Sequence, residues 1–258
     1  MKCQRAIKMS DKIDQTIKGN NNAQTSITIN GDCTIGINRE EVYNIIRSFG
    51  YVNKDEIIDI VKDAIEAVDE SRRVMPDKRI FVPAIQQLSY STDDEILKHT
   101  YKKLLASSMD LDKQMYVHPS FINIISQLNA DEIKLLNSLV CVTAKSYPLI
   151  NLRFKVGNQQ GLGITQIKYF TDIGYGVCDR PQNICVYLEN LERLKLITIP
   201  WDQHLLDTNE YTRLENHPIV QAVKNMNQTN GAVQIKYEYD HLTFSLTQFG
   251  VNFITVCK

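Results

Sequence analysis

Four helix-start signals in the first half of the chain limit the fold more than any other feature. In each, a residue that can cap a helix is followed three positions later by glutamate: Asn38 and Glu41, Asn53 and Glu56, Thr92 and Glu95, Asn129 and Glu132. The cap side chain accepts a first-turn N–H, and the glutamate reaches back to the N–H of the cap residue. Apolar residues at helical spacing follow, such as Ile57, Val61 and Ile65. The sequence therefore predicts a helical body over residues 38–141.

Residues 27–37 show a different period. Every second position carries an apolar or small side chain, and Asn30-Gly31 is a tight-turn signal in the middle. This pattern predicts a short β-hairpin that ends an N-terminal region over residues 1–37. A lone two-stranded hairpin is marginally stable in water, so it either packs on the following helices or pairs with copies of itself. We expect a homo-oligomer whose contacts include Ile27, Ile29, Ile35 and Ile37.

Residues 1–18 are rich in basic side chains. They hold five lysines and arginines against Asp11 and Asp14, and Met9, Ile13 and Ile17 recur at helical spacing. The pattern fits a short amphipathic helix or a frayed terminus. It also fits a basic segment that contacts a partner.

Residues 142–258 predict an α+β part. Residues 147–178 favour strand or irregular structure, with a short helix over 164–173 as the alternative. A helix over 181–194 comes next, and then a strand over 233–239, a turn at Asp240-His241, a strand over 242–246 and a helix capped by Thr247. The order of helix, strands and final Thr-x-x-Gly helix resembles the end of a winged-helix module. The predicted fold class is thus α+β and mainly α, with a helical N-terminal body, a short hairpin and a winged-helix-like C-terminal part.

Charge and composition argue against several classes of protein. The net charge is −1, and Arg180, Arg193 and Lys195 are offset by Glu189 and Glu192, so we expect no specific nucleic-acid binding. No apolar run is long enough to span a bilayer, and no signal peptide is visible. The six cysteines form no Cys-x-x-Cys pair, which favours reduced thiols in a cytoplasmic protein.

Catalytic, metal and cofactor signals are weak. The five histidines are scattered, and Gly161-Leu-Gly163 lacks the residues of a phosphate-binding loop, so we predict no metal and no cofactor. His118 could act as a general base near Asp110. The alternative is a structural histidine at the start of a helix, bonded to a local backbone group and packed on Phe121.

An ordered set of short motifs resembles the abortive infection alpha family of bacterial phage-defence proteins. The motifs run from about Pro83 onward and comprise Thr92–Glu95, Leu104-Leu-Ala to Met109-Asp110, His118-Pro119-Ser-Phe121, Leu128–Leu136 and Asn190-Leu-Glu-Arg193-Leu194. The chain has Leu194-Lys195-Leu-Ile where the family pattern resembles Leu-Gly-Leu-Ile. The resemblance makes Asp110, His118, Pro119, Phe121, Asn190 and Arg193 candidate motif or interaction residues. It supplies no established catalytic residue.

The resemblance implies a component of an anti-phage defence system that harms or arrests the infected host. We expect it to act through protein–protein contacts, with itself and with another defence or phage protein, rather than as an enzyme. Two alternatives remain open from the sequence. One is a winged-helix transcriptional regulator that binds DNA, and the other is an enzyme with a cleft around His118.

Overall fold

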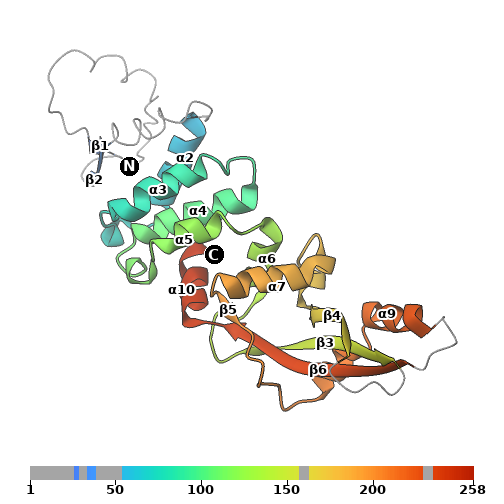
Figure 1. Cartoon of the computed structure of the whole chain (residues 1–258). Coiled ribbons are helices and arrows are strands. Elements are labelled where there is room, and N and C mark those ends of the chain that lie inside the picture. Colours follow the sequence, from blue (N-terminus) through green and yellow to red (C-terminus); the bar gives the residue numbers. More distant parts are fainter. Residues whose placement is uncertain (1–25, 29–33, 39–53, 157–162, 229–234) are drawn as a thin grey trace, which may run out of the picture.

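The computed structural model describes residues 26–28, 34–38, 54–156, 163–228 and 235–258 of the chain (Figure 1). Two short strands, β1 (Ser26–Thr28) and β2 (Thr34–Asn38), pair antiparallel with Ile27 opposite Ile35. The expected turn at Asn30-Gly31 lies outside the described residues. The remaining elements form a helical body and a four-stranded sheet flanked by helices, so the fold is α+β and mainly α, as predicted.

The helical body is built from consecutive helices, three of which start at side-chain caps. The helices are α2 (Lys54–Glu66), α3 (Lys78–Leu88), α4 (Glu95–Ser108), α5 (Ser120–Ile125) and α6 (Ala130–Ser138), with one-turn helices at Glu70–Arg72 and Gln114–Tyr116. Asn129 and Glu132 form the predicted capping box of α6, with both hydrogen bonds present at 2.9 and 2.8 Å. α4 starts later than its Thr92 signal predicts, because Asp94 accepts the N–H groups of Ile96 and Leu97. Residues 39–53 lie outside the described residues, so the caps at Asn38 and Asn53 stay predictions, although α2 begins at Lys54, directly after Asn53.

The sheet has the strand order β4-β3-β6-β5, and all pairs are antiparallel. Its strands are β3 (Ser146–Val156), β4 (Ile164–Phe170), β5 (Ile197–Thr198) and β6 (Ile235–Leu246), and β3 pairs with β6 along its whole length. The predicted turn at Asp240-His241 is wrong, because β6 runs straight through it. Asp240 pairs with Arg153 across the sheet and His241 bonds Glu215 at 2.6 Å, so these polar residues are held in the strand by long-range contacts.

Three helices accompany the sheet, and a fourth returns to the body. α7 (Ile184–Arg193), preceded by a one-turn helix at Pro181–Asn183, contacts β4 and β5. α8 (Asn209–Glu215) and α9 (Pro218–Gln228) contact β3 and β6 respectively. α10 (Gln248–Cys257) packs against α4, so the C-terminal helix lies within the helical body (Figure 1).

The core consists of two apolar clusters. The larger one joins the helical body to α7, β5, α10 and the end of β6, and it includes Leu105, Phe121, Leu188 and Phe253. The smaller one lies between the sheet and α8 and α9, and it contains Ile150, Leu152, Phe170, Tyr211, Leu214 and Val220. The larger cluster contains residues from both sides of the predicted domain boundary between residues 141 and 142. The boundary itself stays a prediction.

Candidate functional site

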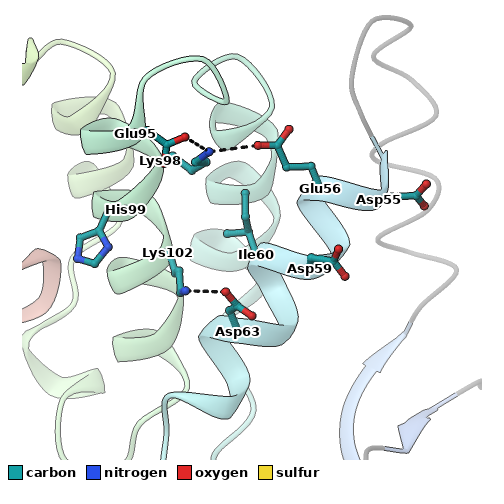
Figure 2. Close-up of a pocket in the computed structure, with 9 residues that line it drawn as sticks. All are labelled: Asp55, Glu56, Asp59, Ile60, Asp63, Glu95, Lys98, His99 and Lys102. Atoms are coloured by element: carbon teal, nitrogen blue, oxygen red, sulfur yellow. Dashed lines mark hydrogen bonds and ion pairs between the residues drawn. The ribbon is translucent and has the colours of Figure 1, made fainter. Parts of the chain in front are cut away.

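A groove of about 530 Å³ lies between α2 and α4 (Figure 2). Its lining combines acidic and basic side chains from both helices: Asp55, Glu56, Asp59, Ile60, Asp63, Glu95, Lys98, His99 and Lys102. Glu56, Ile60 and Asp63 point from α2 toward α4, whereas Asp55 and Asp59 lie along the outer side of α2 (Figure 2). We call this feature the acidic groove, because five carboxylates face two lysines.

Ion pairs with three lysines engage four of the five carboxylates that line the acidic groove. Lys98 bridges Glu56 at 3.2 Å and also bonds Glu95, and Lys102 bonds Asp63 at 2.7 Å. The hydrogen bond to Glu95 is the main reason that the pKa of Lys98 is raised, so this lysine stays charged. Asp59 pairs with Lys62 on its own helix at 3.1 Å. The outer edge of the groove therefore presents carboxylates to solvent.

His99 lies between this groove and a second one. The second groove, of about 690 Å³, is bounded by α4, α6 and the loop at Val177, and it shares Glu95 and His99 with the first. Burial, Lys103 and Lys102 all lower the pKa of His99, so its imidazole is neutral at pH 7. The exposed edge of α4 thus separates an acidic groove from one with a more apolar lining.

His118 lies in an aromatic cluster between α5 and α10. Its Nδ1 accepts the backbone N–H of Ser120 at 3.2 Å, and its ring lies 6.0 Å from Phe121 and 5.6 Å from Phe249 between centroids. Pro119 is the residue before the first turn of α5. Phe121 is fully buried and contacts Phe253 of α10 edge to face.

Asp110 belongs to a different contact. It is 4% exposed, its carboxylate lies 3.6 Å from the Arg72 guanidinium, and it accepts the N–H of Asp112 at 3.0 Å. No hydrogen bond joins Asp110 to His118 among the described residues, so the structure does not assemble the pair that a general-base site would use.

Asn190 and Arg193 connect α7 to the helical body. The Asn190 amide donates to the Glu132 carboxylate at 2.9 Å and to the Gln127 carbonyl at 3.1 Å. Arg193 donates to the side chains of Gln127 and Asn190. Burial raises the pKa of Glu132 despite these donors. The two motif residues thus hold two parts of the fold together.

Asp131 is a buried polar residue whose sequence context carries no functional motif. Its carboxylate accepts the backbone N–H groups of Asp179 and Arg180 at 2.8 and 2.9 Å and the Tyr187 hydroxyl at 2.9 Å. Lys134 lies 3.5 Å away. Asp131 therefore anchors the segment before α7. Its sequence position in the first turn of a helix gives no sign of this role.

Two further expectations concern oligomer contacts and metal binding. The side chains of Ile27, Ile29, Ile35 and Ile37 lie outside the described residues, so their predicted role in oligomer contacts stays a prediction. Within the described chain, no group of three or more His, Cys, Asp and Glu side chains could hold a metal ion. No helix of that part is both long and apolar enough to cross a bilayer.

The sequence model of the family described as "Abortive infection alpha" matches residues 52–257, which is most of the chain. The chain belongs to the abortive infection alpha family. The resemblance seen in the sequence is thereby confirmed, and membership assigns this abortive infection alpha protein to defence against phage. The match spans the helical body, the sheet and the acidic groove.

Other comparisons add little to this family assignment. A search of curated proteins gives no match. A solved structure of an uncharacterized protein from the hydrocarbon-degrading marine bacterium Alcanivorax borkumensis SK2 is similar to part of the chain, at 16% identity and a TM-score of 0.35. That similarity covers 57% of this chain and 94% of the other.

Replacing Asp131 by asparagine should lower the free energy of unfolding by about 1–3 kcal/mol at pH 7. The substitution replaces one carboxylate oxygen, a hydrogen-bond acceptor, with an amide NH₂ group that faces other hydrogen-bond donors. Burial opposes ionisation of Asp131, but the bonds from Asp179, Arg180 and Tyr187 and the charge of Lys134 lower its pKa below 3.8. A carboxylate with a lowered folded pKa stabilises the fold above its unfolded pKa and loses this contribution as the pH falls through the folded value. The deficit of the variant should therefore shrink below pH 3.8.

Urea denaturation of both proteins at a series of pH values measures this deficit. Asp202→Asn, an exposed aspartate in the loop before α8, is the control and should change stability little at any pH. A deficit for Asp131→Asn that stays constant down to the lowest pH at which both proteins fold would contradict the assignment.

Proposed function

We propose that this abortive infection protein acts through protein–protein contacts and that the acidic groove between α2 and α4 is its contact surface. The observation that carries the proposal is the excess of carboxylates around an open hollow of about 530 Å³, with Asp55 and Asp59 turned outward (Figure 2). A concave surface with one sign of charge attracts a partner of the opposite sign and raises the rate of association. The partner would present lysine or arginine side chains to the groove.

The positions of the motif residues support a contact mechanism. His118 and Phe121 pack against α10, Asp110 pairs with Arg72, and Asn190 and Arg193 tie α7 to the helical body. These side chains are occupied in holding the fold together. These motif residues would then maintain the shape on which a contact surface is displayed.

Replacing both Asp55 and Asp59 by lysine should abolish phage protection while lowering the melting temperature only slightly, the loss arising in part because Asp55 lies in the first turn of α2. Both side chains are exposed, and the one ion pair that is lost, between Asp59 and Lys62, is a surface pair worth only about 0.3–0.5 kcal/mol. The measurement is the number of plaques on cells that carry each variant, together with soluble protein level. Asp202→Lys with Asp207→Lys makes the same change of charge at exposed positions in the loop before α8, away from the groove lining, and should leave protection intact. Equal protection by both double variants would refute the groove as the contact surface.

Replacing His118 by glutamine should lower stability modestly and reduce protection only in proportion to the folded protein lost. The imidazole packs against two phenylalanines, and glutamine keeps an acceptor for the Ser120 N–H but not the ring. Melting temperature and plaque counts are compared on the same cells. A variant that folds fully and protects not at all would assign His118 a role in catalysis or partner binding.

The proposal includes two finer features that the sequence predicts. α7, β5, β6 and α10 form a winged-helix-like unit that serves packing rather than DNA reading, since Arg193 is bonded to Gln127 and Lys168 to Glu189. The paired strands β1 and β2 contribute to self-association. Loss of both features would leave the groove proposal standing, because the groove is formed by α2 and α4 alone.

A further inference from the structure

We infer that the acidic groove is the docking site for the chain's own basic segment, residues 1–18. The inference rests on the function proposed above, because it treats the groove as a contact surface, and it names an occupant. A bound segment of the same chain would compete with a basic partner for the same carboxylates.

The charge of the groove fits a basic occupant. Lys98 and Lys102 already pair with Glu56 and Asp63 at the inner wall. At the outer side of α2, Asp55 has no ion-pair partner within the described residues. An occupant lying along this side would meet Asp55, and also Asp59, which pairs only with Lys62 of its own helix.

Residues 1–18 have the complementary character. They carry Lys2, Arg5, Lys8, Lys12 and Lys18 against two aspartates, so lysine and arginine exceed acidic residues by three. The groove lining has the same excess of opposite sign, with five carboxylates against two lysines. Met9, Ile13 and Ile17 recur at helical spacing in the segment, and Ile60 provides an apolar side chain in the groove. Opposite charges and an apolar contact would act together.

The covalent connection makes even a weak contact effective. Residues 19–53 join the segment to Lys54, the first residue of α2, which is itself a wall of the groove. An extended chain spans about 3.3–3.6 Å per residue, so residues 39–53 alone could span a distance on the order of 50 Å, which reaches the whole of the groove. A covalent tether makes the contact intramolecular, so it forms at an affinity that two free partners would not reach.

Carbodiimide cross-linking of the full-length protein tests the inference. The reagent joins a lysine amine to a carboxylate in direct contact, and peptide mass spectrometry identifies the pair. We expect links from Lys2, Lys8, Lys12 or Lys18 to Asp63 and Glu95 of the groove. Links spread evenly over distant carboxylates such as Asp202 would overturn the inference.

A charge-reversed variant separates a specific site from random encounters. Asp55→Lys with Asp59→Lys leaves Asp63 and Glu95 in place, and links from the segment to them should fall about tenfold, because a charge change of this size acts within one Debye length. Asp202→Lys with Asp207→Lys, at exposed positions in the loop before α8, is the matched control and should keep the links. Lys8→Glu with Lys12→Glu should lose them, and combining this pair with the groove reversal should restore links from Lys2 or Lys18 to Asp63. Failure of this restoration, with melting temperatures unchanged, would count against charge pairing at the groove.

A mixture of isotopically heavy and light protein identifies the source of the segment. Links within one chain support the inference, whereas links between heavy and light chains replace it with docking of a second copy. Plaque counts distinguish a failure of the docking inference from a failure of the proposed function. If the cross-links form but Asp55→Lys with Asp59→Lys leaves phage protection unchanged, the proposed function alone is refuted. If this variant loses protection but the parent protein shows no cross-links, the docking alone is refuted.

Discussion

Replacing Leu105 by alanine should lower the free energy of unfolding by about 2–5 kcal/mol. Leu105 is fully buried on α4, in the large cluster that joins the helical body to α7 and α10. The substitution removes a buried isobutyl group and leaves a cavity that rigid helices on several sides cannot close. Leu136 is 1% exposed on α6 and should behave in the same way.

Urea denaturation of the variant measures the loss. Leu206→Ala is the control, since Leu206 is 96% exposed and its truncation should change stability by less than about 0.5 kcal/mol. A loss below about 1 kcal/mol for Leu105→Ala would mean that the buried face of α4 is assigned wrongly.

Replacing Gly250 by alanine should destabilise the protein by at least about 1–3 kcal/mol, the range for forced overpacking. A Cβ atom built at Gly250 would lie 1.9 Å from the backbone carbonyl oxygen of Leu196 and 2.8 Å from its carbon. The obstacle is backbone, so no side-chain rotation relieves it. Thr247 caps α10 by accepting the Gly250 N–H at 2.9 Å and donates to the Lys195 carbonyl, which fixes the helix against this loop.

Gly176→Ala is the matched control, because a Cβ at that position meets nothing within 4 Å. The melting temperature of Gly250→Ala should fall clearly below those of the parent and of Gly176→Ala. Equal melting temperatures for the two variants would show that α10 can shift away from Leu196 at little cost.

Local signals predicted much of the helical body, because capping is decided by residues three positions apart. The box at Asn129 and Glu132 is present as predicted, and the neighbouring signal at Thr92 is off by two residues because Asp94 competes for the same N–H groups. The straight course of β6 through Asp240-His241 was missed. Its partners there, Arg153 and Glu215, are distant in sequence, and no local pattern reports them.

The acidic groove could not be predicted from either helix alone. The acidic residues on α2 and the basic residues on α4 are each typical of an ordinary solvent-exposed helix face. They become a site only when tertiary packing places Lys98 beside Glu56 and Lys102 beside Asp63. The anchoring role of Asp131 was hidden for the same reason, since its partners lie on a segment beyond β4.

The position of α10 determines when the helical body can fold during synthesis. Ser107 of α4 donates to the Val256 carbonyl at 2.9 Å, and Phe121 needs Phe253 to cover it. α2 to α6 are translated well before residues 248–257, a delay on the order of ten seconds at about 5–20 residues/s. A ribosome-bound chain therefore presents uncovered apolar helix faces, which chaperones and proteases recognise. A chain that stops before α10 would be removed by the cell instead of accumulating as a partly active defence protein.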